Sequence, residues 1–216
     1  MKILGIGIVV WLTAVSAHAT GPSQKNVSQP NVFLVTIDTL RADHIHSYGY
    51  DSIQTPALDG LAKDGIRFTE AFTPSPITNI SHTTILTGLL PSSHGVNDFA
   101  VPLAATHPTW AELLKERGYS TAAFIGAVVL DSIALAPGLD RGFDFYDNFP
   151  ERPQTQSRWG RVERRGKVVV QHAETWLNTN RSGPYFVGYI STIHMIRMSH
   201  LRLTSAYTKT TCMTAR

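Results

Sequence analysis

The sequence has little of three features that often reveal a function directly: cysteine, charge of one sign and long hydrophobic runs. Cys212 is the only cysteine in 216 residues, which excludes an intramolecular disulfide and argues against a zinc site built from cysteines. The formal net charge is only +3, so no strong field for binding nucleic acid or another polyanion is implied. The sequence also has no internal repeats or low-complexity blocks, which excludes a repeat architecture.

An apolar run near the N-terminus is too short to span a membrane comfortably. It covers residues 3–15, whereas a transmembrane helix needs about 20 residues. Met1 and Lys2 form a basic start, and Ala17 and Ala19 frame a small-x-small cleavage pattern. These features predict a signal peptide over residues 1–19 and a flexible leader over residues 20–30. We therefore expect an exported protein, periplasmic or secreted, without stable membrane insertion after cleavage; an uncleaved anchor is the alternative.

The rest of the sequence is apolar enough, at 43% hydrophobic residues, to form one packed domain. Three nearly continuous apolar runs predict strands buried on both faces, as in a parallel sheet, over residues 31–38, 120–125 and 184–190. An alternating run at residues 66–72 predicts a further strand with its phenylalanines in the core. Helical patterns lie at residues 56–64, 108–117 and 162–176. The sequence therefore predicts an α/β fold, a mostly parallel central sheet flanked by helices.

Each predicted helix carries an apolar stripe that should face the core. The stripes consist of Leu58, Leu61 and Ala62 in the first helix, Trp110, Leu113 and Leu114 in the second, and Val169, Ala173, Trp176 and Leu177 in the third.

Asp38 ends the first buried run, and ligands in open α/β sheets gather at the carboxyl ends of strands. Calcium, magnesium and manganese take oxygen ligands, which a carboxylate at this place can supply. The alternative is that Asp38 only caps the following turn. Asp140, Asp144 and Asp147 alternate with aromatic residues and are interpreted as loop and turn residues.

The most informative stretch is residues 75–95, in which a turn leads into a short helix. Ser81 or Asn79 is expected to cap the start of this helix, and Gly88 to end it. Thr78 would then lie just ahead of a helix N-terminus, where oxyanions bind. A hydroxyl at that place can serve as the nucleophile for a phosphate or sulfate ester. The alternative is an ordinary turn followed by a helix.

The run Thr-Asn-Ile-Ser-His at residues 78–82, followed by Thr87-Gly88, resembles the signature of the sulfatase family. In that signature a Cys or Ser leads x-Pro-Ser-Arg, and Thr-Gly closes the helix. Thr78 falls at the position of the Cys or Ser that becomes formylglycine, and His82 falls at the position of the Arg. Because a threonine cannot become formylglycine, the resemblance implies a site without that group. It implies catalytic roles for Thr78 and His82.

Three other segments resemble the same family, which belongs to the alkaline-phosphatase-like superfamily: the segment around Asp38, residues 55–72 and residues 139–147. The segment that begins VTIDTLRADH resembles its first metal-binding segment, where many members have two successive aspartates; here Asp38 is followed by Thr39. The resemblance implies Asp38 and Thr78 as ligands of a divalent ion, with calcium preferred over magnesium or manganese. A strand like residues 184–190 ends in a histidine that binds the ester oxyanion in the family, which implies that role for His194. A surface or core histidine is the alternative.

The resemblance extends over residues 31–194 and implies the N-terminal part of a sulfatase-like domain. Residues 195–216 contain no Asp, Glu, Gly or Pro and are interpreted as an aberrant tail, so the domain is expected to be C-terminally truncated. The implied function is metal-dependent hydrolysis of sulfate esters of small molecules or glycans. Two alternatives stay open: a phosphodiesterase or a phosphoglycerol or phosphoethanolamine transferase that uses Thr78, and an inactive truncated fragment.

Overall fold

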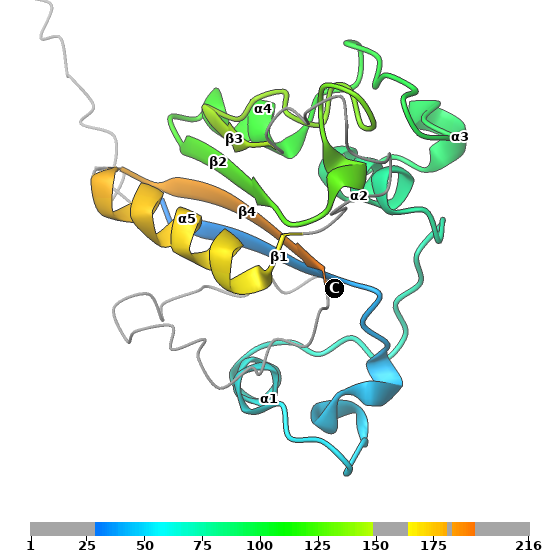
Figure 1. Ribbon diagram of the computed structural model, residues 1–216, viewed down its shortest axis with the longest axis vertical. Helices are drawn as coiled ribbons and strands as arrows, with labels where there is room; N and C mark the ends of the chain where they lie inside the picture. The colour runs from blue at the N-terminus through cyan, green and yellow to red at the C-terminus, as the bar shows by residue number, and fades with distance from the viewer. Residues whose placement is uncertain (1–28, 149–163, 181–182, 193–216) are drawn as a thin grey trace, which may run out of the picture.

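The computed structural model describes residues 29–148, 164–180 and 183–192 (Figure 1). The predicted signal peptide, His194 and the tail at residues 195–216 lie outside the described residues. Among the residues that are described, no helix is long and apolar enough to cross a membrane.

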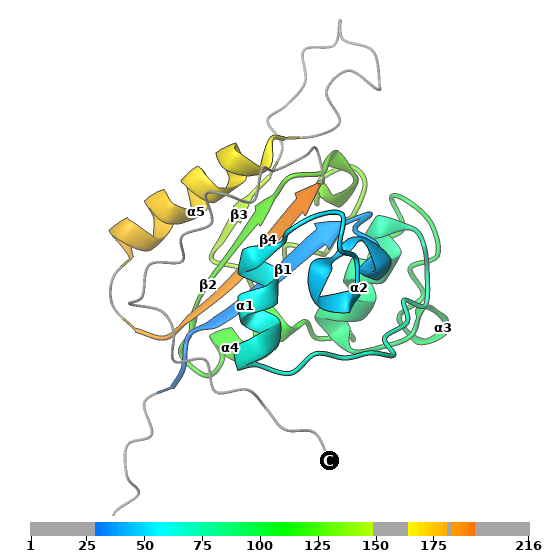
Figure 2. The same cartoon turned by 90° about the horizontal axis from the view of Figure 1, so that it is seen from below.

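The centre of the described part is a parallel sheet of four strands in the order β1-β4-β2-β3. The strands are β1 (Val32–Asp38), β2 (Ser120–Ile125), β3 (Phe145–Asp147) and β4 (Tyr185–Thr192). The three predicted strands are confirmed as β1, β2 and β4. The prediction that β1 is buried on both faces is wrong for the described structure, because Phe33 is 41% and Val35 57% exposed on one face. The short β3 was not predicted, and it corrects the interpretation of Asp147 as a loop residue. Because all four strands are parallel, their carboxyl ends meet at one edge of the sheet (Figure 2).

One face of the sheet is covered by α5 (Gly166–Thr179). Alternate residues of a strand point to the same face, and those of β2 and β4 on this face pack against the helix. The cluster consists of Ala122, Phe124, Val169, Ala173, Tyr185 and Val187, with Trp176 and Leu177 packed against it. The predicted apolar stripe of this helix is therefore confirmed, although the helix starts at Gly166, later than predicted.

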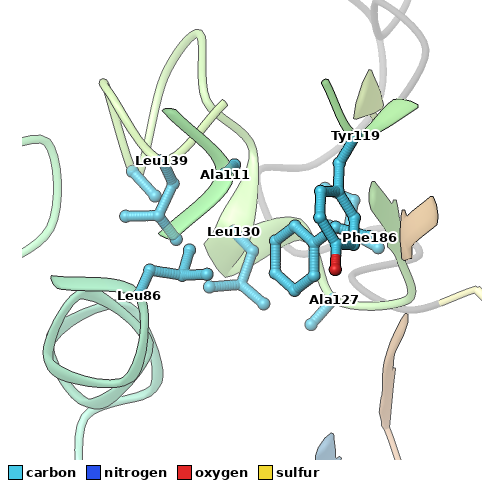
Figure 3. Close-up of a cluster of buried hydrophobic side chains, with 9 residues drawn as sticks. Leu86, Ala111, Tyr119, Ala127, Leu130, Leu139 and Phe186 are labelled. Carbon is cyan, nitrogen blue, oxygen red and sulfur yellow. The ribbon is translucent and has the colours of Figure 1, made fainter. Parts of the chain in front are cut away.

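The opposite face is covered by α2 (Thr78–Thr87), α4 (Trp110–Lys115) and the 3-10 helix η3 (Val128–Leu130). Their apolar side chains join those of β2 and β4 in a second buried cluster: Leu86, Ala111, Tyr119, Ile125, Ala127, Leu130, Ala136, Leu139 and Phe186. Figure 3 shows Leu86 of α2 and Phe186 of β4 reaching this cluster from different sides. Full burial of one such large side chain contributes about 1.5–3 kcal/mol, so α2 is held firmly on the sheet.

The region between β1 and α2 departs most from the prediction. It contains the 3-10 helices η1 (Ala42–His44) and η2 (His46–Tyr48) and the helix α1 (Pro56–Asp64). Residues 66–72, predicted as a strand, are irregular, and Phe68 and Phe72 are 63% and 87% exposed rather than in the core. Leu61 of the expected α1 stripe is 60% exposed. An alternating pattern forms a strand only where a neighbouring strand takes its backbone hydrogen bonds, and within the described residues this segment has no such neighbour.

The helix α4 begins with a capping box in which Thr109 and Glu112 satisfy each other's backbone N–H groups. It is shorter than predicted, and a different face is buried: Ala111 is fully buried, whereas Trp110 is 49% exposed. Leu114 packs at the border of the cluster. The large side chains misled the prediction: Gly142 packs closely against the backbone of Ala111 and Glu112, and of the predicted stripe only Leu114 packs against the cluster.

Candidate functional site

Asp38 is the last residue of β1 and lies opposite Thr192 of β4 at the carboxyl edge of the sheet. Residues two apart on a strand share a face, so Asp38 lies on the same face as Thr36 and Leu34. Leu34 packs against the cluster that includes Leu86 of α2. The carboxylate therefore points toward the face that α2 covers, and α2 lies beside this end of β1 (Figure 2).

Thr39, which follows Asp38, has the left-handed φ of 60°. Its N–H donates to Asp38 Oδ1 over 3.1 Å. A β-branched residue is rarely found in this conformation, which asparagine, aspartate and glycine adopt much more readily. The backbone is therefore strained at the position where the family resemblance gives a second aspartate.

We expect Thr39→Asn to stabilise the protein by about 1 kcal/mol, because it relieves the strain of a left-handed β-branched residue. Denaturant unfolding measures the change. Thr39→Val is the matched control, since it keeps the branch and the strain while losing the hydroxyl. A midpoint for Thr39→Asn no higher than that of Thr39→Val would contradict the prediction.

Thr78 is the first residue of α2, not the residue ahead of it. The helix is preceded by Ile77 at the N-cap position, without a side-chain cap, so the expected caps Ser81 and Asn79 are wrong. Ser75 Oγ instead accepts from the Ile77 N–H over 3.1 Å. The predicted end of the helix at Gly88 is confirmed, with φ of 70°. Thr78 is half-buried within the first turn, where backbone N–H groups have no partner inside the helix.

His82 connects this turn to β1. Its ring is buried, with Nδ1 2.7 Å from the carbonyl oxygen of Thr78 and Nε2 2.9 Å from Thr36 Oγ1. Burial lowers the pKa of His82, against the opposing effects of the Thr78 carbonyl and the Asp38 carboxylate. Thr36, the partner of Nε2, lies two residues before Asp38 on the same face of β1, so Asp38 lies on the side of the sheet that His82 contacts. The structure thus brings Asp38, Thr78 and His82 together, whereas His194 lies outside the described residues.

Two further contacts of this region could not be recognised from the sequence. Thr36 lies inside an apolar strand, where a threonine is ordinary, yet it binds His82. Asn79 is fully buried in α2, and its Nδ2 donates to the carbonyl oxygen of Asp98 over 2.9 Å. Asn79 therefore ties the first turn of α2 to the loop after α3 (Pro91–His94), and only its partner in space reveals this.

We expect the unfolding free energy of the protein to fall in weak acid, because two of its histidines are buried. Burial lowers the pKa of His82 and of His94 below the ordinary value of 6.5, and nearby His107 lowers that of His94 further. As the pH falls, these histidines therefore take up protons in the unfolded chain before they do so in the folded protein. The contribution of the two histidines to the unfolding free energy is complete above about pH 6.5. Below that pH it decreases, by at most about 1.4 kcal/mol per pH unit for each histidine.

Unfolding free energies measured across this pH range test the prediction. In the wild type the Val96 N–H donates to His94 Nδ1 over 3.1 Å. The variant His94→Asn removes one titrating group, and its side-chain oxygen can still accept this hydrogen bond. We expect a shallower decline for this variant. A wild-type stability that stays constant or rises on acidification would contradict the prediction.

The described residues do not make a complete metal site. No group of three or more His, Cys, Asp or Glu side chains within them could hold a metal ion. Asp38 supplies one carboxylate, and Thr39 supplies none where a second is expected. A divalent ion such as calcium takes six to eight oxygen ligands, usually from several carboxylates, so the donor set of the described part does not fit the ion by itself.

The family model and the most similar curated proteins that we compared indicate the same family. A family model described as Sulfatase matches residues 30–198. The N-acetylglucosamine-6-O-sulfatase of Bacteroides thetaiotaomicron is 31% identical over 138 residues, covering 61% of this chain and 25% of that protein. The ulvan-active sulfatase of Formosa agariphila is 30% identical over 196 residues, covering 80% of this chain and 37% of that protein. The match thus spans only 25% to 37% of the length of these relatives.

A solved structure confirms the predicted fold class. The phosphonate monoester hydrolase of Agrobacterium radiobacter superimposes with a TM-score of 0.62 at 22% identity, covering 76% of this chain and 41% of that one. The shared part includes the parallel sheet flanked by helices, so the chain has the fold of part of such a domain.

Proposed function

This chain belongs to the sulfatase family, and from that premise we propose that it acts in the hydrolysis of sulfate esters. The observation that supports the proposal is the Sulfatase match over residues 30–198, joined with the grouping of Asp38, Thr78 and His82 at the carboxyl edge of the sheet. The substrates we propose are sulfate esters of glycans or small molecules, in line with the names of the two relatives.

We propose Thr78 as the nucleophile. Its hydroxyl lies in the first turn of α2, where the partial positive charge of the helix N-terminus stabilises developing negative charge. In the reaction the Thr78 oxygen forms a bond to sulfur and loses its hydroxyl proton, the sulfur–oxygen bond to the alcohol breaks, and the alcohol oxygen takes up one proton. Water then attacks the sulfur, the sulfur–oxygen bond to Thr78 breaks, and Thr78 regains a proton while sulfate and one proton are released. His194 is proposed to bind the oxyanion, and formylglycine has no part in the reaction.

We propose that Asp38 and Thr78 contribute to a site for a divalent ion, with calcium preferred over magnesium or manganese. Because the described donors are insufficient, further ligands must come from elsewhere in the protein. Calorimetry of this chain should accordingly show weak binding or none. Thr39→Asp should strengthen calcium binding, while Thr39→Asn, its neutral match, should not. Micromolar affinity in the wild-type chain would contradict this account.

The function itself is tested by turnover of sulfate monoesters against phosphodiesters with the complete protein. We expect faster turnover of the sulfate esters. A reversed preference would identify the phosphodiesterase or phosphotransferase alternative, which the named relatives do not favour. No turnover of either class would identify an inactive protein. For the 216-residue chain alone we expect little or no catalysis, since its described part lacks most of a metal site.

We also propose that the protein is exported after removal of residues 1–19. The basic start, the apolar run and the Ala17-His18-Ala19 pattern support this proposal. N-terminal sequencing of the mature protein should begin at Thr20. An intact Met1 in the membrane fraction would show that the segment is an uncleaved anchor.

A further inference from the structure

Two histidines are buried around α2, and each uses both ring nitrogens in hydrogen bonds. His82 is 5% exposed and His94 is 2% exposed. A neutral imidazole carries its single ring proton on one nitrogen and leaves the other as an acceptor. The partners of the two nitrogens therefore determine which one holds the proton.

The partner of His82 Nδ1 is the backbone carbonyl oxygen of Thr78, at 2.7 Å. A carbonyl oxygen only accepts, so Nδ1 must carry the proton and donate it. Nε2 then has a lone pair and accepts from the hydroxyl of Thr36, at 2.9 Å. We infer that His82 is a neutral Nδ1–H histidine whose ring joins β1 to the first turn of α2, and that it is a positioning residue for Thr78.

His94 has the reverse arrangement and provides an internal reference. Its Nδ1 lies 3.1 Å from the backbone nitrogen of Val96, which only donates. Nδ1 of His94 must therefore be the acceptor, and Nε2 carries the proton and donates to Thr84 Oγ1, at 3.1 Å. The two buried histidines are thus opposite tautomers within one helical region.

This assignment changes the role expected for His82. The only lone pair of its ring is occupied by the Thr36 hydroxyl, so it is not available to accept a proton from Thr78. The ring instead links Thr78 to Thr36, which lies two residues before Asp38 on the same face of β1. The meaning of this link for catalysis rests on the proposed function of Thr78, whereas the tautomer does not.

The tautomers are measured directly by long-range proton–nitrogen spectra of the chain with nitrogen-15 in its histidine rings, at neutral pH. Signals are assigned with His82→Asn and His94→Asn. We expect protonated Nδ1 and bare Nε2 in His82, and the reverse in His94. An Nε2–H form of His82 would overturn the inference. Catalytic failure with the expected tautomers would count against the proposed function alone.

Two matched threonine variants test the partners. Thr36→Val removes the donor to a bare nitrogen and should move the His82 Nε2 resonance to higher frequency, with the His94 signals unchanged. Thr84→Val removes the acceptor of a protonated nitrogen and should move the His94 Nε2 resonance to lower frequency, with His82 unchanged. Because valine has the shape of threonine, packing is preserved. An unmoved His82 Nε2 resonance in Thr36→Val would show that the link to β1 is wrong.

A third comparison separates positioning from space filling. His82→Asn places an amide nitrogen where Nδ1 stands and can still donate to the Thr78 carbonyl, whereas His82→Phe fills the space without donating. If His82 positions Thr78, the Thr78 backbone resonances shift much less in His82→Asn than in His82→Phe. Equal shifts in the two variants would show that the ring is only part of the packing.

Discussion

Replacing Thr78 by alanine is expected to lower ester hydrolysis by the complete protein by at least about a thousandfold, as loss of a nucleophile does in other hydrolases. The reason is its place in the first turn of α2, beside the end of β1 that carries Asp38. Thr78→Ser keeps a hydroxyl and should retain a measurable part of the activity. Turnover of a sulfate monoester with each purified variant is the measurement.

The control for this experiment is a second hydroxyl of the same turn. Ser81 Oγ donates to the Thr78 carbonyl oxygen over 3.0 Å, so Ser81→Ala removes one hydroxyl close to the site without removing the proposed nucleophile. We expect Ser81→Ala to lose far less activity than Thr78→Ala. Equal activity in the wild type and Thr78→Ala would show that another group attacks the ester.

The parts of the fold that could be predicted are those in which the pattern and the environment agree. The strands β1, β2 and β4 were found because their sequences are nearly continuous apolar runs, although β1 exposes Phe33 and Val35 on one face of the described sheet. The strand β3 is only three residues long and pairs only with β2 among the described strands, so no periodicity could reveal it. Residues 66–72 have the pattern of a strand but lack a strand to pair with among the described residues.

The site was predictable in its residues but not in its connections. Asp38 and Thr78 could be selected because a strand end and a helix start are places where charge and hydroxyl chemistry gather. The link through His82 to Thr36 joins residues 46 positions apart, and neither residue type signals it. The capping of α2 was also missed, since its first N–H groups lie at the site and no side chain of the helix caps them.

Among the glycines that the structure describes, Gly142→Ala is expected to be the most destabilising alanine substitution, by about 2–5 kcal/mol, from strain at positive φ together with overpacking. Gly142 has φ of 83° and packs against the start of α4, where an added Cβ would overlap the backbone nitrogen of Glu112 and lie 2.6 Å from the carbonyl carbon of Ala111. These atoms belong to helix backbone and cannot move aside. The Thr121 hydroxyl also donates to the Gly142 carbonyl oxygen over 2.7 Å, which fixes the loop to β2.

Gly118→Ala is the matched control for this prediction. Gly118 has nearly the same φ, 85°, but an added Cβ would meet no atom within 4 Å. Its cost should be only the conformational strain of about 1–2 kcal/mol. Denaturant unfolding of both variants separates the two contributions, since their difference is the cost of pushing α4 away from the loop. Equal losses of stability in Gly142→Ala and Gly118→Ala would show that α4 can shift to accommodate the added Cβ. The close packing of Gly142 against α4 would then contribute little to stability.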